Sequence, residues 1–218
     1  MKPAMKSILS DSRLYGIVDL GYVRPEEVES TTAALLCGGI RILQLRAKGI
    51  DPATVEHLAR RMQPLCREAG AIFVLNDYPD MAARIGADAV HVGQDAGPLA
   101  AVRNIVGPQM LIGRSTHSPE QALAAVAEGA HYIGFGPVFP TGTKPGRPSI
   151  GLQDIAAVQE QLGDFPMFCI GGINGTTLPS VLQAGARRVV IVSWLLQQPD
   201  PAAAARDIIS RLADRVRH

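Results

Sequence analysis

The sequence carries almost no net charge. Its 218 residues hold 21 Lys and Arg against 20 Asp and Glu, which gives a formal net charge of +1. Proteins that bind nucleic acid or a membrane surface through charge need clustered excess positive charge. We therefore expect neither kind of partner, and any site that binds an anion must be local.

The sequence also has few cysteines and lacks long apolar runs. Cys37, Cys66 and Cys169 are odd in number and show no CxxC spacing, which argues against a disulfide framework and favours free thiols in a reducing compartment. No run reaches the roughly 18 apolar residues of a membrane-spanning helix. The opening segment MKPAMKSILSDSR has no apolar core that would suit a signal peptide. We expect a soluble, cytoplasmic protein.

What the sequence does have is a regular alternation of strand and helix patterns. Helices are predicted, among other places, at Pro25–Cys37, Pro52–Ala69, Pro79–Ile85, Ser118–Glu128 and Leu152–Gln161. Eight short β-branched runs separate the helical patterns, at residues 13–19, 40–47, 71–76, 88–93, 110–115, 131–136, 167–172 and 188–193. Asp51-Pro52 and Ser118-Pro119 are typical helix starts.

Strict alternation predicts a parallel sheet. Eight strand–helix units in roughly 200 residues predict an α/β (β/α)₈ TIM barrel, with an open doubly wound sheet as the alternative. No linker divides the chain, so we expect a single domain over residues 1–218, with residues 1–12 as an N-terminal extension. In such a barrel, chemistry belongs to the loops that follow the strands.

Two cations stand at the end of the second strand. Because strand side chains alternate between faces, Gln44, Arg46 and Lys48 share one face while the apolar Leu43 and Leu45 share the other. Cations directed into a barrel mouth are costly without a negative partner. Core carboxylates could neutralise them, but we favour a phosphate or pyrophosphate ligand.

Carboxylates follow the third and fourth strands. Asn76-Asp77 could cap a helix that begins at Pro79, but beside two cations Asp77 makes a better Mg²⁺ ligand, because magnesium binds one or two carboxylates together with phosphate oxygens and water. Asp95 could supply a second carboxylate. His91 lacks a partner His or Cys at ligand spacing and is expected to be a packed strand residue.

The remaining strand ends are rich in small and hydroxyl residues. Ser115 stands at the end of the fifth strand, and His117 fits a turn better than a proton carrier. No GxSxG motif supports a serine hydrolase. Gly171 and Gly172 after the seventh strand, and the eighth strand's end, favour a second phosphate site formed by backbone N–H groups, although simple glycine turns are the alternative. Two anion sites that face each other indicate group transfer between two phosphorylated molecules.

In combination, the motifs QLRAK, ND, HVGQ, GRSTHS, GPVFPTGTK, GGI and VS resemble the thiamine-phosphate synthase family, over nearly the whole chain. The resemblance implies a TIM barrel that joins 4-amino-2-methyl-5-hydroxymethylpyrimidine diphosphate to 4-methyl-5-(2-phosphoethyl)thiazole, or to its carboxylated form. The products would be thiamine phosphate and pyrophosphate, and the cofactor would be Mg²⁺. The partners implied are phosphorylated small molecules, and a second copy of the chain is a candidate.

The resemblance also implies roles for individual residues. The pyrimidine diphosphate would be bound by Gln44, Arg46, Lys48, Asn76, Ser115 and Lys144, and the thiazole phosphate by Thr141, Thr143, Gly172, Val192 and Ser193. Asp77 would bind the metal, and Lys144 and Ser115 would lie at the reacting centre. The loop Gly134–Leu152, which carries Thr141, Thr143 and Lys144, would act as a substrate-binding lid whose prolines limit its freedom when no substrate is bound.

One departure from the family's pattern concerns the metal. Ala96 occupies the position of the usual second carboxylate, and Asp95 stands one place earlier. Two alternatives to the synthase follow. A thiazole tautomerase of the same superfamily would need a proton carrier, for which His117 is the candidate, and a non-catalytic homologue would bind thiamine phosphate without turnover.

Overall fold

The computed structural model describes residues 3–142 and 148–214. Its eight strands pair in parallel, each with the next along the chain, and β8 closes onto β1. The strands are β1 Leu14–Asp19, β2 Ile42–Arg46, β3 Ile72–Asn76, β4 Ala89–Val92, β5 Leu111–Thr116, β6 Tyr132–Phe135, β7 Met167–Ile170 and β8 Val189–Ile191. The predicted TIM barrel is thus confirmed, and the open sheet is wrong.

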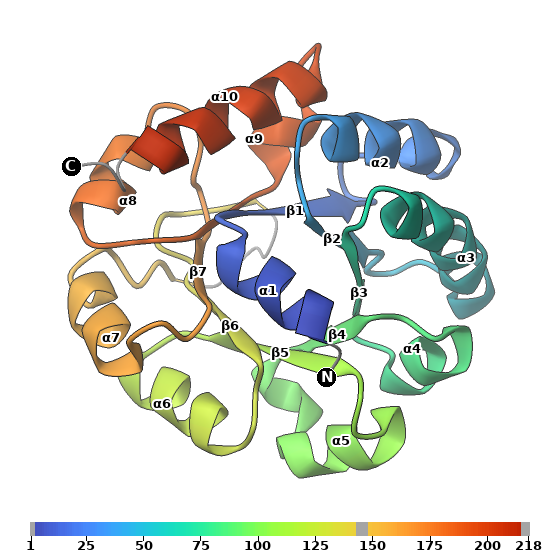
Figure 1. The fold of residues 1–218 in the computed structure, drawn as a ribbon, viewed down its shortest axis with the longest axis horizontal. Helices are drawn as coiled ribbons and strands as arrows, with labels where there is room; N and C mark the ends of the chain where they lie inside the picture. The colour runs from blue at the N-terminus through green and yellow to red at the C-terminus, as the bar shows by residue number, and fades with distance from the viewer. Residues whose placement is uncertain (1–2, 143–147, 215–218) are drawn as a thin grey trace.

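Helices lie around the barrel and, in the case of α1, across one end of it, as Figure 1 shows. They are α1 Pro3–Asp11, η1 Pro25–Glu27, α2 Val28–Cys37, α3 Pro52–Glu68, α4 Pro79–Ile85, η2 Gln94–Ala96, α5 Leu99–Val106, α6 Pro119–Ala127, α7 Ile155–Leu162, α8 Leu178–Gln183, α9 Ser193–Leu196 and α10 Pro201–Asp214. In the described ranges, none of these helices has the length and apolar character needed to cross a membrane.

Two helix starts follow the predicted capping pattern. The Asp51 carboxylate accepts hydrogen bonds from the backbone N–H groups of Ala53 and Thr54, both at 3.0 Å. The Ser118 hydroxyl accepts one from Gln121 N–H at 3.3 Å. A cap of this kind contributes about 1 kcal/mol, because it satisfies a backbone donor that has no partner within the helix.

The barrel sorts side chains into two apolar clusters according to the strand alternation. Leu43 and Leu45 of β2 point outward and pack, fully buried, in the cluster shared with the surrounding helices. Ile42 points inward and belongs to the separate cluster inside the barrel. Since period 2 fixes the faces, Gln44 and Arg46 must also point inward, as the sequence predicts for them.

The N-terminal extension forms a helix that closes one end of the barrel. Figure 1 shows α1 lying across the middle of the ring of strands. Leu9 is buried in the interior cluster, where Ile42, Ile72 and Leu111 stand at or next to the first residues of their strands. The apolar side of α1 therefore fills the end at which the strands begin, which leaves the opposite end for a site.

Candidate active site

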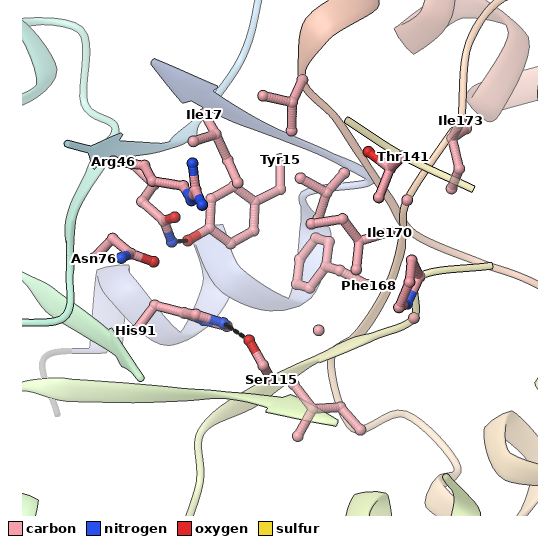
Figure 2. A pocket seen from close by; sticks show the side chains of 18 of the residues that line it. Tyr15, Ile17, Arg46, Asn76, His91, Ser115, Thr141, Phe168, Ile170 and Ile173 are labelled. Carbon is pink, nitrogen blue, oxygen red and sulfur yellow. Dashed lines mark hydrogen bonds between the residues drawn. The ribbon is translucent and has the colours of Figure 1, made fainter. Parts of the chain in front are cut away.

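A pocket opens at the carboxyl ends of the strands and takes residues from all eight of them. The predicted site residues that line it are Gln44, Arg46, Asn76, Ser115, His117, Thr141, Gly172, Val192 and Ser193. Figure 2 shows Arg46, Asn76 and Tyr15 on one side of this pocket and Thr141, Ile170 and Ile173 on the other. Lys48, Asp77 and Asp95 are not among the lining residues, and Thr143 and Lys144 lie outside the described residues.

Arg46 has a buried carboxylate partner, Asp19, so the core carboxylate that the sequence analysis gave as the alternative to a phosphate ligand is present for this cation. Arg46 Nη1 donates to Asp19 Oδ2 at 2.7 Å, and the Asp19 side chain is only 1% exposed. The Asp19 carboxylate also accepts from Gly21 N–H at 3.0 Å. A guanidinium has five N–H donors, and the pairing with Asp19 uses one of them and fixes the orientation of Arg46.

Lys48 lies farther out than the strand pattern predicts. β2 ends at Arg46, and the chain turns at Gly49, whose φ of 75° suits glycine. The alternation of faces therefore does not extend to Lys48. Its side chain is 56% exposed, and Nζ lies 2.6 Å from Asp77 Oδ2. Lys48 stands at the rim of the pocket rather than inside it.

Asp77 is not used as a helix cap. The N-cap of α4 is Tyr78, and no side chain caps this helix start. Asp77 Oδ2 instead accepts from Lys48 and from Asn76 Nδ2, the latter at 2.9 Å. Both Asp77 and Tyr78 have left-handed backbones, with φ of 60° and 51°. Such residues cost about 1–3 kcal/mol each and cluster at functional sites.

The loop after β4, next to the loop that carries Asp77, holds a second carboxylate, Asp95. Asp77 N–H donates to the His91 carbonyl at 2.8 Å, which ties the ends of β3 and β4 together. Asp95 lies in η2, exposed, one residue before Ala96. Arg114 Nη1 holds this loop through the Gly97 carbonyl at 2.9 Å, and Gln94 Nε2 holds it through the Ser115 carbonyl at 2.6 Å.

This donor set fits magnesium. Within residues 3–142 and 148–214, no three His, Cys, Asp or Glu side chains gather closely enough to hold a metal ion. Mg²⁺ does not need such a cage, because one or two carboxylates suffice when water and substrate phosphates fill the rest of its shell. Asp77 and Asp95, on neighbouring loops, match that requirement.

Ser115 contacts a histidine that the sequence analysis assigned to packing alone. His91 Nε2 lies 3.0 Å from Ser115 Oγ, and both residues line the pocket. Figure 2 shows this contact as a dashed line. Inside the barrel, the rings of Tyr15, Tyr132 and Phe168 meet edge to face, with ring centroids 5.5–6.2 Å apart. The strand alternation that directs Gln44 inward also directs these three aromatic side chains into the barrel. The sequence pattern was therefore sufficient to predict them.

The loop after β6 is bound to the end of β7. Val138 N–H donates to the Ile170 carbonyl at 2.8 Å, and Phe139 N–H donates to the Gly171 carbonyl at 3.1 Å. A Cβ at Gly172, whose φ is 64°, would lie 2.6 Å from Phe139 Cβ. Gly172, which the sequence analysis expected to leave room for a ligand, thus also leaves room for this loop. The loop brings Thr141 into the pocket, which Gly172, Val192 and Ser193 also line.

The closed parallel barrel, with a pocket at the carboxyl ends of its strands, places the protein in the TIM-barrel class. The family model described as thiamine monophosphate synthase matches residues 14–195. The chain belongs to the thiamine-phosphate synthase family.

Individual relatives agree with this assignment. The chain is 48% identical to the thiamine-phosphate synthase of Thermus thermophilus over 182 residues, which is 83% of this chain and 87% of that protein. It is 43% identical to the thiamine-phosphate synthase of Acidothermus cellulolyticus over 96% of this chain and 99% of that one. The solved thiamine phosphate pyrophosphorylase of Pyrococcus furiosus superposes with a TM-score of 0.84 at 28% identity, covering 95% and 98% of the two chains.

Proposed function

We propose that this protein is a thiamine-phosphate synthase that joins 4-amino-2-methyl-5-hydroxymethylpyrimidine diphosphate to 4-methyl-5-(2-phosphoethyl)thiazole, or to its carboxylated form. The observation that carries the proposal is one pocket with two different ends. Gln44, Arg46, Asn76 and Ser115 come from β2, β3 and β5, whereas Thr141, Gly172, Val192 and Ser193 follow β6, β7 and β8. Two substrates bound at these ends would face each other.

In this reaction the bond between the pyrimidine's methylene carbon and the diphosphate oxygen breaks, and pyrophosphate leaves with the electron pair. The 4-amino group stabilises the resulting cation by resonance, and the thiazole nitrogen then forms the new bond to the methylene carbon. With the carboxylated thiazole, the carboxylate also leaves as CO₂, and the ring carbon that keeps the electron pair takes up a proton. Arg46, Lys48 and Lys144 would neutralise the negative charge that develops on the leaving group. Positioning and electrostatics account for the catalysis, and no protein nucleophile is needed.

Asp77 and Asp95 are the residues that would hold Mg²⁺, which when bound neutralises charge on the diphosphate. The N–H groups of Gly172 and Ser193, together with the hydroxyls of Thr141, Thr143 and Ser193, would bind the thiazole phosphate. Ser115 would contact the pyrimidine, with His91 holding its hydroxyl at 3.0 Å.

Purified protein supplied with both substrates and Mg²⁺ is expected to form thiamine phosphate and pyrophosphate in equal amounts. Chromatography of the product and a pyrophosphate assay measure the two. Tight binding of thiamine phosphate by calorimetry, without any turnover, would instead identify the protein as the non-catalytic homologue.

Replacing Lys144 with alanine is expected to lower kcat by about 100-fold or more, because one cation facing the leaving diphosphate is lost. The melting temperature should change far less than turnover, because the proposed role of Lys144 is to bind substrate and not to support the fold. Turnover assays and thermal melting of the variant check both expectations. Equal losses of activity and stability would contradict the role of this loop as a substrate-binding lid.

The tautomerase remains a second candidate on one observation. His117 lines the pocket, and its Nδ1 lies 2.5 Å from the Gly136 carbonyl oxygen. Nδ1 must therefore carry a proton, and Nε2 is the nitrogen that could accept one. A proton carrier typically contributes 100-fold or more to a rate, and the proposed synthase reaction does not use His117 in that way. The His117→Ala variant is therefore expected to retain synthase activity within about tenfold. Tautomerisation of a carboxylated thiazole phosphate by the wild type, lost in this variant, would favour the second candidate.

A further inference from the structure

The loop that follows β1 meets the loop that follows β6 at the carboxyl ends of the strands. β7 and β8 separate these two strands in the closed barrel. Nevertheless, a Cβ placed on Gly142 of the β6 loop would lie 3.3 Å from the hydroxyl oxygen of Tyr22 in the β1 loop. A methyl group would be crowded there, so the glycine is what lets the β6 loop come this close to Tyr22.

The β1 loop gives this contact a fixed support. The N–H groups of Tyr22 and Val23 donate to the Asp19 carbonyl at 2.9 and 3.0 Å, and Gly21 N–H donates to the Asp19 carboxylate at 3.0 Å. Val23, 5% exposed, packs in the apolar cluster shared with the surrounding helices. The backbone that carries the half-buried Tyr22 side chain is therefore tied to the end of β1.

The contact at Gly142 adjoins a residue that lines the pocket. Thr141, one position earlier, is part of the pocket lining, whereas Tyr22 stands outside it. On the other side of Thr141, Phe139 N–H donates to the Gly171 carbonyl at 3.1 Å and ties the loop to the end of β7. Thr141 is thus held between two supports, one on the β7 end and one on the β1 loop.

We propose that Tyr22 is a positioning residue for the thiazole-phosphate end of the site, and that it acts through Gly142 to hold the Thr141 hydroxyl where a phosphate oxygen accepts from it. The inference rests on the proposed function and adds a residue of the β1 loop to that end. A hydrogen bond to a charged oxygen is strong but depends on distance and angle. Loss of the support beside Thr141 therefore weakens phosphate binding without removing any group that touches the phosphate.

The test is calorimetric binding of each substrate without the other, so that no reaction occurs. The thiazole phosphate is titrated in the presence of Mg²⁺ and pyrophosphate, and the pyrimidine diphosphate in the presence of Mg²⁺. Tyr22→Ala should weaken binding of the thiazole phosphate by about tenfold, the order expected when a hydrogen bond to a charged group is lost. Affinity for the pyrimidine diphosphate should stay within about twofold, because the backbone bonds of the β1 loop do not involve this side chain.

A double-mutant cycle tests whether Tyr22 acts through Gly142. Gly142→Ala places a methyl group 3.3 Å from the Tyr22 hydroxyl oxygen and should weaken binding of the thiazole phosphate by about tenfold when that hydroxyl is present. In the Tyr22→Phe background the hydroxyl is gone, and the same change should cost less than about threefold. Equal costs in the two backgrounds would overturn the proposal. If Tyr22→Ala does not fold, this cycle decides by itself.

Glu26→Ala is the control, because Glu26 lies in the same connection between β1 and α2 and its side chain is 65% exposed. Both affinities of this variant should stay within about twofold of the wild-type values. Wild-type affinity for the thiazole phosphate in Tyr22→Ala would overturn the proposal and leave the proposed function intact. Wild type that binds both substrates but makes no thiamine phosphate would refute the proposed function alone, and failure to bind the thiazole phosphate would refute both.

Discussion

Replacing Arg46 with glutamine is expected to reduce kcat/KM by about 1,000-fold, the upper range for losing a group that stabilises charge in a transition state. The same change should also destabilise the fold. It leaves the Asp19 carboxylate, 1% exposed, without its cation, and an unpaired buried charge costs about 3–5 kcal/mol. Steady-state kinetics and urea unfolding measure the two effects separately.

A second substitution distinguishes catalysis from folding. Adding Asp19→Asn removes the buried charge that Arg46→Gln leaves behind, so most of the lost stability should return, as it does when both members of a buried pair are replaced. Activity should not return, because the guanidinium is still missing. Recovery of both stability and activity in the double variant would mean that Arg46 acts only through the fold.

Replacing Asp77 with asparagine is expected to lower activity at a fixed magnesium concentration by about 100-fold or more, because the charged metal ligand is lost. The magnesium concentration needed for half-maximal rate should rise at least about tenfold for the same reason. Stability should change by less than about 1 kcal/mol, since the pair with the exposed Lys48 is a surface ion pair. A magnesium titration of the rate checks these expectations.

The neighbouring loop supplies the controls for this prediction. Asp95→Asn removes the second proposed ligand, an exposed carboxylate, and should also raise the magnesium concentration needed for half-maximal rate. Ala96→Asp restores a carboxylate at the family's usual position and should lower the magnesium requirement. An Asp77→Asn protein with the wild-type magnesium requirement would contradict the metal role of Asp77, whatever the other two variants do.

Local chemistry in the sequence was enough to predict much of the fold. Alternating strand and helix patterns specify the barrel, and Asp51 and Ser118 cap helices because a side-chain oxygen satisfies the first backbone donors wherever the helix lies. Strand period also predicts that Gln44 and Arg46 point inward, because a residue's face depends only on its position along the strand.

What depended on contacts between distant segments could not be predicted. Asp19 and Arg46 are 27 residues apart and become partners only because β1 and β2 pair in the register that sets them side by side. The two-residue alternation of faces does not apply to Lys48, because β2 ends at Arg46. Likewise, nothing local to Gly172 reveals that Phe139 occupies the space a side chain there would need.

The helix α1 packs Leu9 against the first residues of the strands and so closes that end of the barrel. Ligands that enter from the carboxyl ends of the strands must also leave there. In the proposed reaction, a pyrimidine ring seated against Tyr15 and Gln44 would lie deeper in the barrel than the residues that follow β6, β7 and β8. The pyrimidine would then enter first and the thiazole second. The joined product would leave with its thiazole end in front.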